Sequence, residues 1–402
     1  MTTTVVIIGA GSAGLATAAA LRRYRIDPVI LEQGDAVGTS WRHRHSELRL
    51  NTIRWLSDMP GLRIPRSAGR WVSRDDYIAY LERYAQKQHL DIRFGVHVQR
   101  IVPAPGGWQV TTNDGELHAD HVIVATGHER VPRLPDWHGR AGFTRPILHV
   151  GDLHRAADLT GAQVLLVGAG NSGIEMAGHL VDAGVARLWL SVRTPPNILP
   201  RELYGVPLHP LTLALRHLPE RLRDALALAV AHRAFGDLSR YGLPAASQGP
   251  FQRMRTTGVT VAIDQGFVEH LTARRVRIVS AIDHLDRAEA VLQDGTRLQP
   301  DVILAATGYH PGLTDLVGHL DVLDHRGRPT NGTSQHPSGT NLWFIGYHPA
   351  IEGNLRQHPI EARRIARAIA RQQRGGDTWA TFAEIGRYRA QAVPGRGTRE
   401  SR

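Results

Sequence analysis

The stretch "VLLVGAGNSGIEMAG", residues 164–178, repeats a pattern that the chain has already used in "VVIIGAGSAGLATAAAL", residues 5–21. Each copy is an apolar run, then Gly-x-Gly-x-x-Gly, then small residues at helical spacing. In such a turn the first glycine allows a tight bend, the second lets the backbone approach a pyrophosphate, and the third lets helix and strand pack closely. The N–H groups at the helix N-terminus then attract the phosphates. The sequence therefore predicts an α/β fold with two dinucleotide-binding units.

A second strand and an acidic residue complete the first unit. Residues 5–8 read as a strand, residues 13–21 as a helix, and "DPVILEQ" as a second strand that ends in Glu32. An acidic side chain at this strand end accepts hydrogen bonds from a ribose diol. We therefore expect the first site to bind a nucleotide whose ribose has a free 2′-hydroxyl.

The second unit differs from the first at the corresponding strand end. Its second strand, "ARLWLSVRT", ends in Arg193 and Thr194 instead of an acid. A guanidinium suits a 2′-phosphate, which a carboxylate would repel. An exposed arginine without a ligand is the alternative, but the position favours NADP over NAD. FAD in the first site and NADPH in the second is the simplest pairing, a hydride donor and the flavin that receives the hydride.

Two near-repeats indicate how the units are joined. "DGELHADHVIVATGHERVPRLP" at 114–135 and "DGTRLQPDVILAATGYHPGL" at 294–313 each read as a strand pair ending in Ala-Thr-Gly. They lie at matching ends of the two units, so we expect two Rossmann-like domains, the second inserted into the first. The predicted ranges are 1–155 and 310–402 for the FAD-binding domain and 156–309 for the NADPH-binding domain. "NLWFIGYHP" would return the chain to the first sheet, "IEARRIARAIARQ" would be the closing helix, and a basic tail would follow.

Composition excludes several classes of protein. Hydrophobic residues make up 42% and charged residues 21% of the chain, as in ordinary globular proteins. The net charge of +11 comes from scattered arginines, with Lys87 the only lysine, so we expect a solvated basic surface and no nucleic-acid partner. The most apolar segment, 211–235, is interrupted by charges and predicts a helical pair that packs on a domain or walls a substrate entrance. We therefore expect no membrane association, a cytoplasmic location and small-molecule partners; the oligomeric state stays open.

The chain contains no cysteine. This excludes disulfides, thiolate metal sites and electron transfer to a cysteine pair. Its 22 histidines lack metal-ligand spacing, and the nearest cluster, "HRHSE" at 43–47, is too weak to predict a metal site. Dioxygen, a quinone or a protein such as a ferredoxin remain as electron acceptors.

Several longer motifs resemble one family. "GTSWRHRHSELRLNT", "VGAGNSGIEMA", "VRTPPNILPRELYG", "YGLPAASQGP" and "ILAATGY" are similar to class B flavin-dependent monooxygenases, most closely the YUCCA group, whose plant members convert indole-3-pyruvate to indole-3-acetate. The similarity runs from about residue 5 to residue 370. The linker "FTRPILHVGDL" matches the class signature at Phe143 and His149, but Arg145 replaces its glycine and Leu153 its aromatic residue. We therefore expect Baeyer–Villiger chemistry to be less favoured, and give His149 a functional and a structural role equal weight.

The resemblance implies a mechanism that needs little side-chain chemistry. NADPH reduces the flavin, dioxygen adds at C4a, and the C4a-(hydro)peroxyflavin oxygenates a small substrate, by oxidative decarboxylation of an aryl-pyruvate-like acid or by N- or S-oxygenation. Asn51 in "LRLNT" falls where the family places a polar residue beside the flavin, and it is the predicted catalytic residue; a simple chain-turning role is the alternative. An NAD(P)H:acceptor reductase that serves a quinone or ferredoxin is the second hypothesis, and a non-catalytic nucleotide sensor the third. The predicted cofactor-binding residues are Gly9, Gly11, Ser12, Ala13, Gly14, Glu32, Gln33, Ser40, Trp41, Thr52, Val98, Thr126, Gly127, Gly168, Gly170, Asn171, Ser172, Gly173, Arg193, Thr194, Thr307, Gly308 and Gly346.

Overall fold

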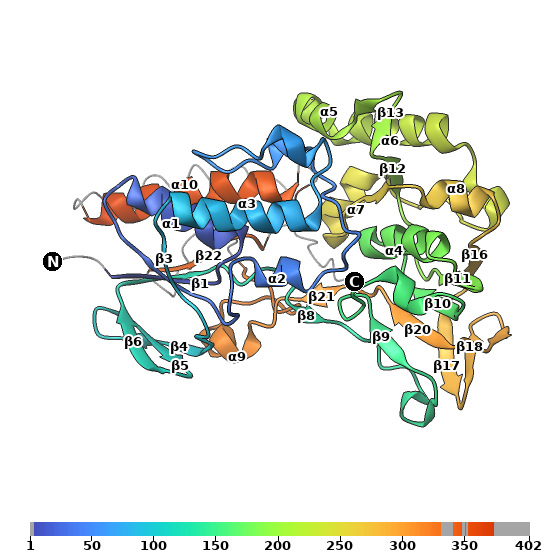
Figure 1. The fold of residues 1–402 in the computed structure, drawn as a ribbon, viewed down its shortest axis with the longest axis horizontal. Coiled ribbons are helices and arrows are strands. Elements are labelled where there is room, and N and C mark those ends of the chain that lie inside the picture. The colour runs from blue at the N-terminus through green and yellow to red at the C-terminus, as the bar shows by residue number, and fades with distance from the viewer. Residues whose placement is uncertain (1–3, 331–340, 348–349, 351–352, 374–402) are drawn as a thin grey trace, which may run out of the picture.

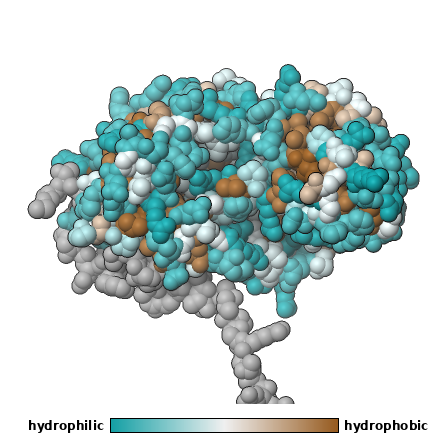
Figure 2. Space-filling view, turned by 90° about the horizontal axis from the view of Figure 1, so that it is seen from below, coloured by the Kyte–Doolittle hydropathy of each residue, from teal (hydrophilic) through white to brown (hydrophobic). Residues whose placement is uncertain are grey.

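The computed structural model describes residues 4–330, 341–347, 350 and 353–373, and these build two halves that lie side by side, each around a five-stranded parallel sheet (Figure 1). The strand order is β22-β7-β1-β2-β3 in the first sheet and β16-β11-β10-β20-β9 in the second. The predicted basic tail lies outside the described residues. Figure 2 shows the lower surface as mainly hydrophilic, with hydrophobic residues gathered on the half that carries the second sheet.

The first sheet is covered on both faces. Helices α1 (Ser12–Arg22), α3 (Arg74–Lys87) and α10 (Asn354–Gln373) pack on one face, and the antiparallel strands β4 to β6 lie on the other (Figure 1). Burial on both faces explains why its strands are continuous apolar runs. In the first strand, Val5 and Ile7 face the helices, while Val6 and Ile8 face the small antiparallel sheet. The parallel strands are β1 (Val5–Ile8), β2 (Val29–Leu31), β3 (Asp91–Arg93), β7 (His121–Val124) and β22 (Leu342–Phe344), and the antiparallel ones are β4 (Val98–Ala104), β5 (Gly107–Thr112) and β6 (Gly115–Ala119).

The second sheet repeats the strand–helix–strand unit of the first. Helix α4 (Asn171–Asp182) connects β10 (Gln163–Val167) to β11 (Arg187–Ser191), as α1 connects β1 to β2 in the first sheet. The antiparallel strands β17 (Ile282–Asp286), β18 (Glu289–Leu292) and β19 (Arg297–Leu298) form a three-stranded sheet in the same half. The strands of the second sheet are β9 (Ile147–His149), β10 (Gln163–Val167), β11 (Arg187–Ser191), β16 (Arg277–Val279) and β20 (Val302–Ala305).

The strands of the two sheets are nested in the order of the chain. The first sheet takes strands from before residue 125 and after residue 341, and all strands of the second lie between. One strand differs from the predicted ranges, because β9 falls within 1–155 yet pairs with β20 of the second sheet. The domain boundaries at 155/156 and 309/310 stay a prediction. The pairing of β9 with β20 favours a first boundary that lies before β9 in the chain. Where the chain passes between the halves, β8 (Val131–Pro132) pairs with β21 (Tyr309–His310).

A helical layer lies at the outer edge of the second half (Figure 1). It contains α5 (His209–Ala214) and α6 (Glu220–Phe235), in the segment where a helical pair was predicted, and α7 (Pro250–Thr257) packs against α6 closer to the first half. Below it, β12 (Ile198–Pro200) pairs in parallel with β15 (Ala262–Asp264). Among the described residues, no helix is long and apolar enough to cross a membrane. The remaining elements are α2 (Thr39–Arg42), the hairpin β13 (Glu202–Leu203) and β14 (Val206–Pro207), α8 (Phe267–Thr272) and α9 (Thr314–Val317).

Candidate cofactor and substrate cavity

The two glycine turns have the same geometry. Gly9 has a φ of 107° and Gly168 a φ of 106°, a left-handed conformation that favours glycine. A Cβ atom on Gly14 would stand 1.9 Å from the carbonyl oxygen of Gly9, and one on Gly173 would stand 1.9 Å from that of Gly168. Each helix therefore begins in direct backbone contact with the turn before it, as the motif predicts.

The two Ala-Thr-Gly segments occupy equivalent places against these turns. A Cβ atom on Gly9 would stand 2.8 Å from the carbonyl oxygen of Ala125, and one on Gly168 would stand 2.6 Å from that of Ala306. The last glycines of the segments, Gly127 and Gly308, both have a φ of 85°. The second half is therefore a structural repeat of the first down to single backbone positions.

Glu32 lies directly after β2 and beside the first turn. Its side chain is 6% exposed, with Oε2 accepting a hydrogen bond from Ala10 N at 2.7 Å and Oε1 one from Gly34 N at 2.9 Å. These two backbone donors fix the carboxylate in one orientation at the rim of the turn. The remaining lone pairs are available to hydroxyl donors such as those of a ribose.

A cavity of about 1310 Å³ extends from the first glycine turn into the second half. Its size and its mixed apolar and polar lining are typical of a site for large cofactors and a substrate. The predicted residues that line it are Gly9, Gly11, Ser12, Ala13, Glu32, Gln33, Ser40, Trp41, Asn51, Thr52, Val98, Thr126, Gly127, Asn171, Ser172, Gly308 and Gly346.

Seven predicted residues do not line the cavity, namely Gly14, Gly168, Gly170, Gly173, Arg193, Thr194 and Thr307. Gly14 and Gly173 act through helix packing, as their close backbone contacts indicate. Arg193 and Thr194 are exposed beyond the end of β11. Thr307 donates its hydroxyl proton to the carbonyl oxygen of Arg133. Their proposed contacts with a cofactor stay predictions.

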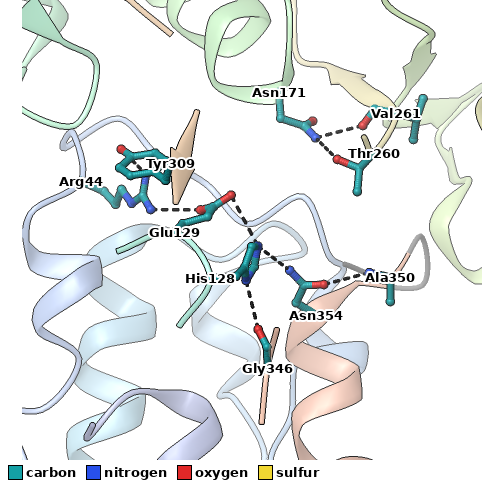
Figure 3. Close-up of polar contacts among 10 residues, drawn as sticks. All are labelled: Arg44, His128, Glu129, Asn171, Thr260, Val261, Tyr309, Gly346, Ala350 and Asn354. Carbon is teal, nitrogen blue, oxygen red and sulfur yellow. Dashed lines mark hydrogen bonds and ion pairs between the residues drawn. The ribbon is translucent and has the colours of Figure 1, made fainter. Parts of the chain in front are cut away.

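A polar network that the sequence did not predict lines the cavity between the halves (Figure 3). Arg44 Nη1 donates to the hydroxyl of Tyr309 at 2.6 Å, and Arg44 Nη2 lies 3.0 Å from Glu129 Oε2. His128 Nδ1 lies 3.1 Å from the Gly346 carbonyl oxygen and its Nε2 lies 3.5 Å from Asn354 Nδ2. His128 Nε2 also lies 3.8 Å from Glu129 Oε1, and this contact joins the two parts of the network. Only the position of two of these residues in the sequence could have indicated the network, since Glu129 and Tyr309 each closely follow an Ala-Thr-Gly segment.

The side chain of Asn171, in the second glycine turn, is already engaged with its own half (Figure 3). Its Nδ2 donates to the Val261 carbonyl oxygen at 2.9 Å and to Thr260 Oγ1 at 3.3 Å, and its Oδ1 accepts from Ile263 N at 2.9 Å. Asn171 therefore holds the strand segment 260–263 beside the turn. Its predicted contact with a cofactor stays untested, and any such contact would have to compete with these bonds.

Asn51 reaches the cavity from the first half and contacts the second half. Its Oδ1 accepts a hydrogen bond from Gln265 Nε2 at 2.9 Å, and Gln265 Oε1 accepts one from Arg201 Nη1 at 2.6 Å. The Arg201 guanidinium also lies over the ring of Trp71, 4.5 Å from its centroid, and burial lowers the pKa of Arg201 from its usual value. Gln265 carries no motif that sequence analysis could have recognised.

Apolar side chains from the segment 211–230 and from Pro250 and Phe251 form one wall of the cavity, and the substrate-entrance role considered for 211–235 stays a prediction. The wall residues that line the cavity are Leu211, Leu215, Leu226, Ala227, Val230, Pro250 and Phe251. Among them Arg223 stacks on Phe251, with its Cζ 4.6 Å from the ring centroid, and its Nε is buried without a hydrogen-bond partner among the described residues. A cation in apolar surroundings favours a ligand that brings a negative charge.

The linker residues pack structurally. His149 is fully buried, with Nε2 lying 3.0 Å from the Gly308 carbonyl oxygen and Nδ1 accepting from Gly151 N at 3.0 Å. Burial lowers the pKa of His149, which favours the neutral ring. Leu153 is buried in the core of the second half. Of the functional and structural roles considered for His149, these contacts support the structural role.

The "HRHSE" segment meets helix α4 across the interface between the halves. His45 is buried, its Nδ1 lies 3.3 Å from Glu47 Oε2 and its Nε2 lies 3.9 Å from Glu175 Oε1, while His179 Nε2 lies 3.8 Å from the same Glu175 oxygen. Burial is the main cause that lowers the pKa of His45. In the described part of the chain, no group of three or more histidine or acidic side chains is arranged to hold a metal ion.

Known proteins share this sequence and architecture. The family model for pyridine nucleotide-disulphide oxidoreductases matches residues 6–200, although a chain without cysteine has no thiols for disulphide chemistry. Indole-3-pyruvate monooxygenase YUCCA1 from Oryza sativa subsp. japonica is 34% identical over 309 residues, covering 76% of this chain and 76% of that protein. Flavin-containing monooxygenase from Stenotrophomonas maltophilia has a TM-score of 0.68 at 24% identity, over 92% of this chain and 98% of its own. OTEMO in complex with FAD and NADP has a TM-score of 0.72 at 18% identity, over 96% and 88%.

Proposed function

The chain belongs to the class B flavin-dependent monooxygenases related to YUCCA, as its motifs predicted, and from this we propose that it binds FAD and NADPH and oxygenates a small organic acid. The observation that carries the proposal is a cavity that reaches the first glycine turn and, in the second turn, Asn171 and Ser172, and that continues to an apolar wall. OTEMO, which has the same fold, binds FAD and NADP together.

The residues at both turns fit dinucleotides. Apart from its chain neighbours, a Cβ atom on Gly11 or on Gly170 would meet no atom of the described residues within 4 Å, so the backbone at each motif's second glycine has open space beside it. That space and the helix N-termini suit a pyrophosphate. FAD would be held by Gly9, Gly11, Ser12, Ala13, Gly14, Glu32, Gln33, Ser40, Trp41, Thr52, Val98, Thr126, Gly127 and Gly346. NADPH would be held by Gly168, Gly170, Asn171, Ser172, Gly173, Arg193, Thr194, Thr307 and Gly308.

Bound FAD, once reduced by NADPH, supplies the activation of dioxygen. The protein's own residues bind and orient the reactants and exclude water. Glu32 holds a ribose, and Asn51 presents a polar group where it lines the cavity. Arg193 distinguishes NADPH from NADH through the 2′-phosphate, because a guanidinium forms paired, charge-assisted hydrogen bonds with it.

The apolar wall and Arg223 support an aryl-pyruvate-like acid as substrate. The ring or alkyl part would pack on Leu226 and Phe251, and the carboxylate would pair with the buried side of Arg223. The reaction would be a 2-oxo acid plus dioxygen, NADPH and a proton giving the acid shorter by one carbon, carbon dioxide, water and NADP⁺. N- or S-oxygenation is the second candidate, since the same wall accepts an uncharged apolar substrate.

The test is turnover of the FAD-loaded protein with NADPH under ¹⁸O₂, with a panel of 2-oxo acids, amines and sulfides and with the products analysed by mass. We expect the product acid to carry one ¹⁸O atom and to have lost carbon dioxide. Appearance of all electrons as hydrogen peroxide with every compound would refute oxygenation. Fast quinone or ferredoxin reduction that persists without oxygen would favour the acceptor-reductase hypothesis, which family membership disfavours.

A further inference from the structure

The amide of Asn51 has two ends with opposite properties, and which end faces the cavity decides what the residue can do. Its Oδ1 accepts hydrogen bonds and its Nδ2 donates them. The two ends have nearly the same shape, so packing alone does not choose between them. The neighbouring polar side chains must set the orientation.

Arg201 provides the choice, because a guanidinium only donates hydrogen bonds and remains charged in proteins. The group that faces Arg201 must therefore be the oxygen of Gln265, and this contact measures 2.6 Å. The Gln265 NH₂ group then points the other way and also only donates. It meets Asn51 at 2.9 Å, so Asn51 must present its oxygen there.

The consequence is that Asn51 Nδ2 is left to face away from Gln265. Asn51 lines the cavity, and its Nδ2 makes no hydrogen bond to the described residues. We propose that Arg201 and Gln265 are positioning residues that turn the N–H donors of Asn51 toward the cavity. This inference rests on the proposed function, in which a donor at this place would support an oxygen atom of the reacting groups.

The strands explain why the two positioning residues meet. Arg201 directly follows β12 and Gln265 directly follows β15, and these parallel strands end in register with Pro200 opposite Asp264. Arg201 is further held by the ring of Trp71 from the first half. Asn51 also belongs to the first half, so the second half sets the orientation of a side chain that it does not carry.

The decisive variant is Gln265→Glu. A carboxylate keeps the size of the side chain and the contact with Arg201, but it can only accept hydrogen bonds. Asn51 must then rotate its amide so that Nδ2 donates to the new carboxylate at position 265 and Oδ1 faces the cavity. Gln86→Glu, the same chemical change on an exposed position of α3, is the matched control.

The first readout is NMR of the FAD-loaded protein labelled with ¹⁵N at asparagine side chains, with Asn51→Ala assigning the signal. In Gln265→Glu we expect the Asn51 NH₂ protons to shift downfield and to exchange with water about tenfold more slowly, as a hydrogen bond to a charged group implies. Asn51 signals that match those of wild type and of Gln86→Glu would overturn the proposal.

Two changes at Arg201 guard against a folding defect in Gln265→Glu. Arg201→Met removes the donor, so both amides can take two orientations and we expect the Asn51 signal to split or broaden. Arg201→Lys keeps a charged donor and should restore the single wild-type signal. One sharp, unshifted Asn51 signal in Arg201→Met would also overturn the proposal.

The second readout is the ratio of oxygenated product to hydrogen peroxide during NADPH oxidation in air. We expect Gln265→Glu to lower this ratio about tenfold, to the level of Asn51→Ala, with an unchanged KM for NADPH and no further loss in the double variant. Additive losses would contradict action through Asn51. If wild type forms no product at all, the proposed function fails, and the NMR result still decides the orientation of Asn51.

Discussion

The second and third glycines of the first motif, Gly11 and Gly14, have different physical roles, and two alanine substitutions separate them. At Gly14 an added Cβ would stand 1.9 Å from the backbone oxygen of Gly9, a fixed atom. At Gly11 an added Cβ would meet no atom of the described residues within 4 Å other than those of its chain neighbours, and the φ of −80° and ψ of −179° of Gly11 suit any residue. Gly14→Ala should therefore disturb the fold, whereas Gly11→Ala should disturb only a ligand that passes through that space.

The expected magnitudes follow from these contacts. Because real Cβ atoms stay at least 3.0 Å from such oxygens, Gly14→Ala must push α1 away by about 1 Å, against a helix packed on α10. Overpacking of this kind costs about 1–3 kcal/mol in the free energy of unfolding. In Gly11→Ala, the lower conformational entropy of the unfolded chain stabilises the fold, whereas alanine caps the helix less well than glycine does. Because these effects oppose each other, the free energy of unfolding of the apoprotein should change by less than about 1 kcal/mol. A methyl group against a bound pyrophosphate should weaken FAD binding by about fivefold to a hundredfold.

The assay is denaturant unfolding of the FAD-free proteins together with FAD titration followed by flavin fluorescence. The second motif provides the matched pair. A Cβ on Gly170 would have no non-neighbouring atom of the described chain within 4 Å, and a Cβ on Gly173 would stand 1.9 Å from Gly168 O. Gly170→Ala should raise the KM for NADPH and leave FAD binding unchanged. An unchanged FAD affinity in Gly11→Ala, or a stability loss there equal to that of Gly14→Ala, would refute the assignment of the first turn.

Four further predictions follow from single side chains. Glu32→Gln should weaken FAD binding by about 1.5–3 kcal/mol with an unchanged circular dichroism spectrum, because charged hydrogen bonds to the ribose are lost; an unchanged dissociation constant would contradict this. Arg193→Ala should raise the KM for NADPH about ten- to a hundredfold and leave that for NADH nearly unchanged, and equal losses with both cofactors would make the residue structural. Arg223→Ala should raise the KM for 2-oxo acids but not for uncharged sulfides, whereas equal effects on both would remove the carboxylate from the argument. Burial lowers the pKa of His121 from 6.5 to about 4, so between these pH values the unfolded chain binds a proton that the folded chain does not. As the pH drops through that window, His121 should lower the free energy of unfolding by about 1.4 kcal/mol per pH unit, and His121→Phe should reduce the measured slope by that amount; an unchanged slope would contradict this.

The sequence predicted the parts of the fold that depend on short-range pattern. The expected first strand coincides with β1, the expected helix 13–21 lies within α1, and Glu32 does follow β2. A glycine triplet between an apolar run and a run of small residues specifies its geometry through contacts a few residues apart, such as Gly14 against Gly9. The closing helix was also predicted, although α10 begins at Asn354, before the predicted 360–372.

The unpredicted features depend on how the two halves meet. The pairing of β9 with β20 lies within the second sheet and is a separate case: it was not predicted because the two strands are distant in sequence and nothing in "ILH" indicates which sheet it completes. Arg44 meets Tyr309 across the interface between the halves, and Asn51 meets Gln265 there. Such contacts carry no periodicity and no spacing, since they depend on where two separately formed units dock.

This division has a consequence for the chemistry. Each glycine turn is complete within its own half, so each half can present a dinucleotide site with local contacts alone. The cavity between them is different, because it combines residues of both halves. The amide of Asn51 comes from the first half, whereas the hydrogen bonds that orient it, from Arg201 to Gln265 and from Gln265 to Asn51, are donated by the second half. A displacement of one half against the other by more than a hydrogen-bond length would leave both dinucleotide sites intact and release the amide. Oxygen chemistry would then be supported only while the halves are closed together, whereas cofactor binding would not depend on closure. For the same reason the cofactors could be predicted from local motifs, while the orientation of Asn51, which depends on contacts between the halves, could not.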